Sequence, residues 1–228
     1  MGEIFFTYVI LDHRNKKEII IREEIMREEA TEEKDYISKF QYLDHGFVAL
    51  IDVMPNKIED GDKAIIDAAR ISYGKGTKKR SNDENLIRYL MRNNHTSPFE
   101  MVEFKFHLKM PIFVARQHIR HRTASVNEIS ARYSIMSDEF YVPKKDDIGV
   151  QSLVNNQGRD ILDAEKSKEW VEKILEKIKK TTNQAYEVYN ELIEENLARE
   201  LARIVLPVSN YTEMIWKKVS MLGICYLM

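Results

Sequence analysis

The sequence is poor in cysteine and glycine and lacks any long apolar run. Its one cysteine, Cys225, can form no disulfide within the chain and no thiolate metal cluster, so a reducing compartment suits the protein and we expect it in the cytoplasm. No apolar stretch approaches the roughly 18 residues of a membrane-spanning helix, so we expect no membrane partner. The start, Met1 to Leu11, lacks the basic leader of an export signal, and we expect none.

Neither sign of charge is in clear excess. The chain has 35 Lys and Arg against 37 Asp and Glu, a formal net charge of -2, and this balance argues against a nucleic-acid partner. The eight glycines include no GxGxxG pattern, so no Rossmann cofactor site is predicted. The segment 74–80 lacks the GxxxxGK[ST] spacing of a phosphate-binding loop and is interpreted as a basic loop.

Composition and periodicity predict an α+β protein in which helices dominate. Residues 1–40 are expected to form an N-terminal appendage, with strands over 3–11 and 17–22 in a hairpin and an acidic helix over 23–40. Residues 41–228 are expected to form the main domain. Its predicted elements are a strand over 47–53, a helix over 60–73, a helix capped by a box at Ser81–Glu84, a strand over 102–109, a helix from Pro111, a loop over 143–163, and helices over 164–196 and 198–206. The core-facing residues expected in 164–196 are Trp170, Ile174, Ile178, Tyr186, Tyr189, Leu192 and Ile193.

The most informative feature is a change in the type of cation. Between Lys109 and Lys144 this lysine-rich chain has no lysine, but it has Arg116, Arg120, Arg122 and Arg132, with His118 and His121 among them. Guanidinium groups are planar forks that suit phosphates, carboxylates and heterocycles, whereas an ammonium is a mobile point charge. The cluster therefore predicts a site for a small anionic ligand.

Local spacing leaves several interpretations of this stretch open. On a helix from Pro111, Arg116 and Arg120 share a face, and Arg120 and Arg122 then diverge, which suits two anionic groups. A basic last turn that favours the helix dipole is the simpler alternative. Ser125 to Glu128 has capping-box spacing and can equally begin another helix. Two histidines three residues apart, without HExxH or a nearby cysteine, predict no metal site, and an RNA-binding arginine patch is a further alternative.

A longer motif contains these arginines. The stretch 117–134 reads QxxRHRxAxxNExSARYS and strongly resembles the flavin-dependent thymidylate synthases. Four other segments are similar in the same order: 69–73 (ARISY), 95–100 (HTSPFE), 111–117 (PIFVARQ) and 200–207 (ELARIVLP), followed by Tyr211, Thr212 and Trp216. The resemblance runs from about residue 44 to 217 and leaves the first 40 residues outside it.

The resemblance implies an α+β fold in which helices pack on a small antiparallel sheet, here without the family's C-terminal helices. It also implies a homotetramer with active sites shared between subunits. It implies reductive methylation of dUMP to dTMP with FAD, NADPH and methylenetetrahydrofolate. The positions that match dUMP contacts are Gln117, His118, Ile119, Arg120, Glu128, Ile129, Ser130, Ala131, Arg132 and Arg203. Those that match FAD contacts are Ser97, Arg120, His121, Arg122 and Glu128, with Ser72 and His95 as lesser candidates. Neither Ser130 nor Cys225 is expected to act as a nucleophile, and Ser130 is interpreted as a hydrogen-bonding contact.

The pattern departs from the family after Trp216. Val219 stands where the family has an asparagine, Met221 where it has an arginine, and the later arginine that polarises the uracil ring has no counterpart. We therefore expect a truncated or frame-shifted C-terminus and predict no catalytic residue. On this basis the chain is either a synthase with doubtful turnover, a noncatalytic nucleotide- or flavin-binding module, or a fragment that needs a second polypeptide.

Overall fold

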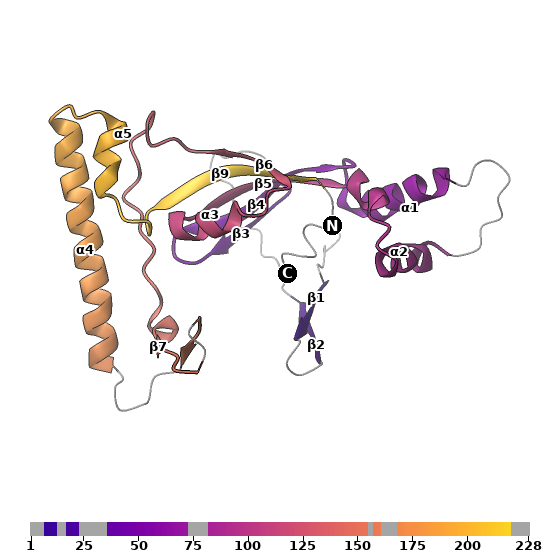
Figure 1. Cartoon of the computed structure of the whole chain (residues 1–228), viewed down its shortest axis with the longest axis horizontal. Helices are drawn as coiled ribbons and strands as arrows, with labels where there is room; N and C mark the ends of the chain where they lie inside the picture. The colour runs from indigo at the N-terminus through magenta and orange to yellow at the C-terminus, as the bar shows by residue number, and fades with distance from the viewer. Residues whose placement is uncertain are drawn as a thin grey trace, which may run out of the picture.

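Helices at both ends of a central sheet define the architecture. The structure, a computed structural model, describes residues 7–12, 17–22, 36–72, 82–154, 157–160 and 168–219. In Figure 1, α4 (Lys168–Glu194) and the short α5 (Arg199–Ala202) lie at one end, and α1 (Gly61–Ile71) and α2 (Asp83–Arg92) at the other. The predicted α+β class, with helices on a small antiparallel sheet, is confirmed.

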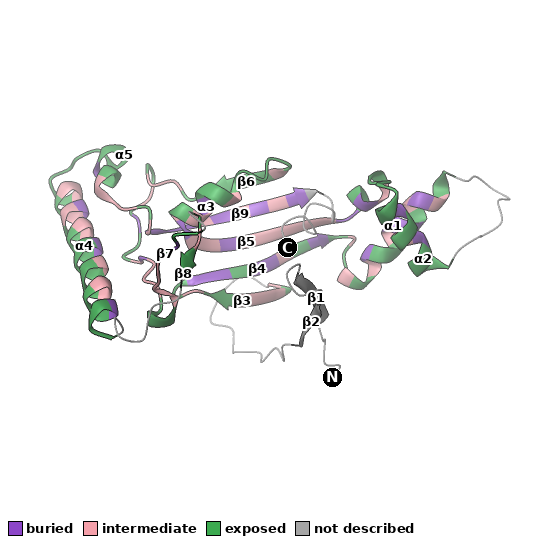
Figure 2. Cartoon of the chain, turned by 60° about the horizontal axis from the view of Figure 1, so that its bottom comes forward, coloured by how far each residue is buried: buried purple, intermediate pink, exposed green. Residues whose placement is uncertain are grey.

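The central sheet has five antiparallel strands in the order β3-β4-β5-β9-β6. The strands are β3 (Ser38–Tyr42), β4 (Gly46–Met54), β5 (Glu103–Pro111), β9 (Tyr211–Val219) and β6 (Ala124–Glu128). Strand β9 comes last in the chain and lies between β5 and β6 (Figure 2). The stretch after Pro207 therefore completes the sheet, although no strand was predicted there.

One face of the sheet is apolar and is covered by α3 (Ile112–His118). Alternation along β5 puts Leu108 on this face with Phe106, and their β9 partners Met214 and Trp216 lie beside them. Ala115 of α3 packs against this group, which forms a buried core cluster. The predicted half-buried strand over 102–109 and the helix from Pro111 are thus confirmed, with Pro111 at the N-cap.

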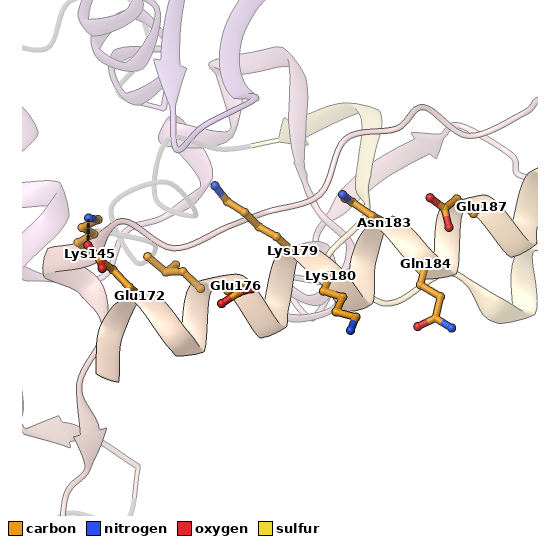
Figure 3. Close-up of a pocket in the computed structure, with 9 residues that line it drawn as sticks. Lys145, Glu172, Glu176, Lys179, Lys180, Asn183, Gln184 and Glu187 are labelled. Carbon is orange, nitrogen blue, oxygen red and sulfur yellow. Dashed lines mark hydrogen bonds and ion pairs between the residues drawn. The ribbon is translucent and has the colours of Figure 1, made fainter. Parts of the chain in front are cut away.

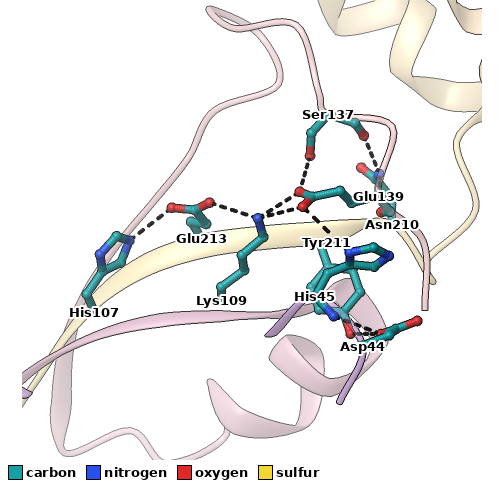
Figure 4. A network of polar contacts seen from close by, with 9 residues as sticks. All are labelled: Asp44, His45, His107, Lys109, Ser137, Glu139, Asn210, Tyr211 and Glu213. Atoms are coloured by element: carbon teal, nitrogen blue, oxygen red, sulfur yellow. Dashed lines mark hydrogen bonds and ion pairs between the residues drawn. The ribbon is translucent and has the colours of Figure 1, made fainter. Parts of the chain in front are cut away.

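The opposite face carries a polar network around Lys109 (Figure 4). The Lys109 ammonium lies 2.7 Å from Glu139 Oε2 and 3.5 Å from Glu213 Oε1. His107 Nε2 is 3.0 Å from the other Glu213 oxygen, and its Nδ1 is 2.7 Å from the Tyr36 hydroxyl. The network ties β5 and β9 to the segment that crosses this face after β6.

Two smaller cores hold the helical ends. At one end, α1 and α2 pack on the 3-10 helix η2 (Ser97–Met101) through Ile65, Leu86 and Phe99. At the other end, Tyr189 of α4 is fully buried with Met136 and Ala202. The predicted helix over 164–196 is confirmed as α4, but the prediction of a core-facing Trp170 is wrong, because that side chain is exposed and Val171 is buried instead.

Helix α2 begins at a different cap from the one predicted. Asn82 is the N-cap, and its side chain accepts a hydrogen bond of 3.0 Å from the Asn85 amide. The helix is therefore capped one residue after the predicted position, Ser81. Asparagine is as good a cap as serine, so spacing alone could not decide between them. The helix predicted over 60–73 is confirmed as α1, which follows η1 (Ile58–Asp60).

The N-terminal hairpin is confirmed, with β1 (Thr7–Asp12) paired antiparallel to β2 (Lys17–Arg22). The acidic helix predicted over 23–40 is wrong for residues 36–40, which are not helical and of which 38–40 belong to β3. Residues 23–35 lie outside the described residues. Strand β3 therefore crosses the predicted boundary at residue 40 and joins both sides of it to one sheet.

The remaining elements are short. The loop predicted over 143–163 contains the 3-10 helix η3 (Lys145–Asp147) and a two-residue pairing of β7 (Val150–Gln151) with β8 (Arg159–Asp160). The helix predicted over 198–206 is split into α5 and the 3-10 helix η5 (Arg203–Val205). The basic loop predicted over 74–80 lies outside the described residues. No helix in the described part of the chain is long and apolar enough to cross a membrane.

Candidate functional site

The arginine-rich motif lies just beyond the end of α3. The helix ends at His118, and the Arg120 amide donates to Gln117 O at 3.2 Å in the turn that follows. The prediction that Arg120 shares a helix face with Arg116 is therefore wrong, because Arg120 lies outside the helix. The side chains of Arg116, Arg120 and Arg122 are exposed, and none is paired with a carboxylate of the described residues. Their charge is available to a ligand.

His118 faces the sheet rather than this exposed turn. Its ring centroid lies 4.9 Å from that of Trp216 and 6.1 Å from that of His121. Burial, and next the charge of His121, lowers the pKa of His118 below its ordinary value. The His118 Nε2 and Trp216 Nε1 atoms are buried and find no hydrogen-bond partner among the described residues. His118 therefore packs its ring against Trp216 rather than presenting it in the exposed turn.

Residues 124–128 form β6, an edge strand paired with β9. The alternative of a helix capped by Ser125 and Glu128 is therefore wrong, because pairing with β9 overrides the local capping signal. Glu128, at the end of the strand, accepts a hydrogen bond from Thr212 Oγ1 at 2.6 Å. The next amide, that of Ile129, donates to Glu213 O at 2.9 Å and extends the ladder by one step.

A tight turn follows β6 and presents Arg132. The amides of Tyr133 and Ser134 both donate to Ser130 O at 3.0 Å, and the Arg132 amide donates to Ser130 Oγ at 3.3 Å. Ser130 therefore shapes the turn as well as standing at a predicted contact position. Ala131 packs against the core cluster of Tyr189, which anchors the turn to the helical end.

The structure brings Arg132 and Arg203 together through Glu200. Arg132 Nε lies 3.4 Å from Glu200 Oε2, and Arg203 Nε donates to Glu200 O at 3.3 Å. Arg199 also donates to Tyr133 O at 2.7 Å, which joins α5 to the turn. Two predicted dUMP residues that are far apart in sequence therefore both contact Glu200.

The predicted residues fall into two groups at opposite ends of the sheet. Arg122 precedes β6 and Arg132 follows it, and the five residues of this strand span about 16 Å. Ser97 and His95 lie at the same end as Arg122, since η2 leads into β5 where β9 finishes. Ser72 ends α1 at that helical end. The main chains of Arg122 and Arg132 therefore lie at opposite ends of β6, whereas the expectation was of one cluster.

Two further observations bear on ligand chemistry. Among the described residues, no group of three or more His, Cys, Asp and Glu side chains is arranged to hold a metal ion. A surface groove of about 890 Å³ runs along α4, lined by both signs of charge and bordered by the Lys145–Glu172 ion pair of 2.9 Å (Figure 3). The groove contains none of the residues predicted to bind a ligand.

Sequence reasoning missed two residues that contact candidate site residues, Thr212 and Glu200. Both occur in segments that carry the family resemblance, but neither was predicted as a site residue. Their contacts with Glu128 and Arg132 depend on chain segments that meet only in the folded protein. The family-like segments around them were the available signal.

Comparison with known proteins identifies the family. The family model described as thymidylate synthase complementing protein matches residues 49–218. The flavin-dependent thymidylate synthase of Dictyostelium discoideum is 54% identical over 178 residues, covering 76% of this chain and 57% of that protein. The flavin-dependent thymidylate synthase of Gluconobacter oxydans is 52% identical over 182 residues, with 78% and 57% covered. The chain thus spans 57% of the length of these relatives.

Solved structures agree with this match. The UMP/dUMP methylase PolB from Streptomyces cacaoi, bound with 5-Br dUMP, is 30% identical with a TM-score of 0.68, covering 81% of this chain and 77% of that chain. A second PolB structure, bound with 5-Br UMP, is 34% identical with a TM-score of 0.66, covering 77% of this chain and 71% of that chain. Sequence and fold together show that the chain belongs to the thymidylate synthase complementing protein family, the family of the flavin-dependent thymidylate synthases.

Proposed function

We propose that this chain binds dUMP and FAD and takes part in the reductive methylation of dUMP to dTMP, with methylenetetrahydrofolate and NADPH as co-substrates. The observation that carries the proposal is the set of exposed, acid-free guanidinium groups at Arg120 and Arg122 within a family-specific motif. The names of the relatives and the nucleotide analogues bound to PolB support the choice of ligand.

The dUMP half of the site is proposed at the end of β6. Arg132 and Arg203 offer forked donors to a phosphate, since their only described acidic neighbour, Glu200, is exposed and contacts Arg132 loosely at 3.4 Å. Glu128 offers a carboxylate oxygen to an N–H or hydroxyl of the nucleotide. The other positions assigned to this half are Ile129, Ser130 and Ala131, whereas Gln117, His118, Ile119 and Arg120 precede β6 and are proposed to reach dUMP from another copy of the chain.

The FAD half is proposed at the other end of β6. Arg120, His121 and Arg122 are exposed there and suit the pyrophosphate, and Ser97 with the lesser candidates His95 and Ser72 lies at the same end of the sheet. When bound, the flavin supplies the hydride chemistry of the reaction. The role of the chain is to hold the two ligands and to place cations where charge develops on the pyrimidine, an effect that is strongest where water is excluded.

We further propose that a complete site needs two copies, within a homotetramer. The two halves flank β6, whose five residues span about 16 Å, so a nucleotide bound at one end is remote from the dUMP positions that precede the strand at the other end. Exposed apolar side chains surround the dUMP half, including Ile204 at 73% and Val208 at 59% exposed. Such surfaces are typical of subunit interfaces. A cytoplasmic location fits the nucleotide substrates and the single cysteine.

A noncatalytic nucleotide- or flavin-binding module is the second candidate. It is favoured by Val219 and Met221, which stand where the resemblance implies an asparagine and an arginine. In this case the arginines bind ligand, but turnover is absent or needs a second polypeptide that completes the site.

The test measures binding and turnover separately. We expect purified protein to show the visible absorbance of bound flavin and to bind dUMP. Arg122→Gln should weaken FAD binding at least tenfold, whereas Arg88→Gln, a change at an exposed helical pair, should leave it unaltered. Tritium release from C5-labelled dUMP with NADPH and methylenetetrahydrofolate identifies the synthase, and bound flavin without release identifies the binding module. Absence of both flavin and dUMP binding would refute the proposed function.

A further inference from the structure

We infer that Thr212 is a positioning residue that holds the Glu128 carboxylate in its ligand-binding orientation. The inference rests on the proposed function, in which Glu128 offers a carboxylate oxygen to the nucleotide in the dUMP half. It assigns a role to a buried hydroxyl that makes no ligand contact of its own in the proposal.

The hydroxyl of Thr212 is enclosed and has a single acceptor. Thr212 is only 2% exposed, and alternation along β9 puts it on the α3 face with Met214 and Trp216. Its Oγ1 donates to Glu128 Oε1 at 2.6 Å, the short distance expected when the acceptor is a carboxylate. A buried hydroxyl without an acceptor is costly, so this donor strongly favours one rotamer of Glu128.

The backbone fixes Glu128 from the other side. Glu128 lies opposite Met214 in the β6–β9 ladder, and the Ile129 amide continues that ladder to Glu213 O at 2.9 Å. The carboxylate therefore reaches diagonally along β9 to Thr212, two residues from its register partner. With main chain and one oxygen both held, only Glu128 Oε2 remains without a partner among the described residues.

This arrangement has a consequence for binding. Glu128 is exposed apart from this contact, and a free glutamate at the end of an edge strand samples many rotamers in water. Thr212 removes that freedom before a ligand arrives, and pre-organisation of this kind strengthens binding. Loss of the hydroxyl should thus weaken dUMP binding without removing any atom that touches dUMP.

The experiment compares three variants in the full chain. Thr212→Val keeps the β-branched shape that suits a strand and deletes the hydroxyl, and Thr212→Ser restores a hydroxyl. Thr182→Val is the matched control, because Thr182 is also buried, at 5% exposed, but its hydroxyl donates to Lys179 O within α4. Each variant is titrated with dUMP while the visible spectrum of bound flavin is followed, and its melting temperature is measured.

We expect Thr212→Val to raise the dUMP dissociation constant about tenfold and to alter the flavin spectral change, with Thr212→Ser within about twofold of wild type. Thr182→Val should lower the melting temperature but leave the dUMP dissociation constant unchanged. Equal dUMP affinity in wild type and Thr212→Val overturns the inference while leaving the proposed function intact. A wild-type protein that binds neither ligand overturns both.

A double-mutant comparison tests whether Thr212 acts through Glu128, with dUMP affinity and melting temperature as the two measurements. If Thr212 acts through Glu128, Thr212→Val should cause no further loss of dUMP affinity once Glu128→Gln is present, and the two melting-temperature changes should not add. Additive losses in both measurements would show that the residues act separately and would overturn the positioning role.

Discussion

The Tyr211 hydroxyl donates a hydrogen bond to Asp44 Oδ1 and so joins the start of β9 to the turn between β3 and β4 (Figure 4). Asp44 also accepts from the Val142 amide at 2.9 Å. Burial acts to raise the pKa of Asp44, but the hydrogen bonds from Tyr211 and Val142 outweigh it and hold that pKa below its ordinary value. Burial and the same carboxylate raise the pKa of Tyr211.

Tyr211→Phe should therefore destabilise the protein in a pH-dependent way. We expect a loss of about 1 kcal/mol in the free energy of unfolding at neutral pH, the low end for a bond to a charged group because Asp44 is exposed. Because the pKa of Asp44 is lower in the folded protein than in the unfolded chain, its charge stabilises the fold at pH values above 3.8, its ordinary pKa. This contribution is lost as the pH falls through the lower pKa of the folded protein. Urea unfolding at neutral pH and at about pH 3 should thus show the difference shrinking in acid.

Tyr186→Phe is the control for this prediction. The Tyr186 hydroxyl donates to a neutral acceptor, Met136 O, at 3.2 Å, so its loss should cost the same free energy at both pH values. A difference between wild type and Tyr211→Phe that stays constant into acid would contradict the account of Asp44.

His118 makes a second pH-dependent contribution to the free energy of unfolding, through a group that becomes positively charged rather than negatively charged. Its pKa is lowered by burial against Trp216, so the unfolded chain takes up a proton that the folded chain resists. The free energy of unfolding is therefore highest above pH 6.5, the ordinary pKa of histidine in the unfolded chain, and it falls as the pH drops below that value. We expect His118→Phe to flatten the dependence of the unfolding free energy on pH between about 7.5 and 5.5. His121→Gln, at an exposed position, should keep most of that slope.

The polar face of the sheet depends on Lys109. The Lys109 side chain is 15% exposed and its ammonium lies between Glu139 and Glu213, so Lys109→Met leaves these two carboxylates without the cation between them. We expect a loss of about 2 kcal/mol in the free energy of unfolding, below that of a fully buried pair because both carboxylates are partly exposed. Lys145→Met removes an exposed pair with Glu172 and should cost less than about 0.5 kcal/mol. Equal effects in the two variants would mean that burial of the Lys109 network is unimportant.

Local patterns in the sequence were sufficient for β5, α1, α3 and α4. The alternation over 102–109 and the proline at position 111 are patterns of residues adjacent in sequence. They are therefore sufficient to predict the strand and the helix that these residues form. The replacement of lysine by arginine and the spacing of the arginines also located the motif. Its turn after α3 is exposed, as a ligand site requires.

Features that depend on distant pairing were not predictable. Residues 125–128 carry a valid capping signal, yet they form β6 because β9 is available as a partner. Likewise, the separation of Arg122 from Arg132 follows from β6 being an extended strand, whereas a helix would have kept the two arginines close. Register and strand order are set by the whole sheet, so the contact of Thr212 with Glu128 had no local signal.

Gly46, at the start of β4, is required by a close approach of three strands. A Cβ there would lie 2.6 Å from Tyr42 O and 2.9 Å from Lys109 O, both main-chain atoms that cannot move without distorting the β3–β4–β5 ladder. Gly46→Ala should therefore cost about 1–3 kcal/mol in the free energy of unfolding, as overpacking does. Gly61→Ala is the matched change, because its Cβ would meet only Val102 methyl groups at 3.8 and 3.9 Å at the start of α1. Alanine favours the helix there, so we expect that variant to be as stable as wild type or more stable by up to about 1 kcal/mol. Urea denaturation of the two variants side by side measures the contrast, and a Gly46→Ala protein as stable as Gly61→Ala would show that the strands can separate at this point without penalty.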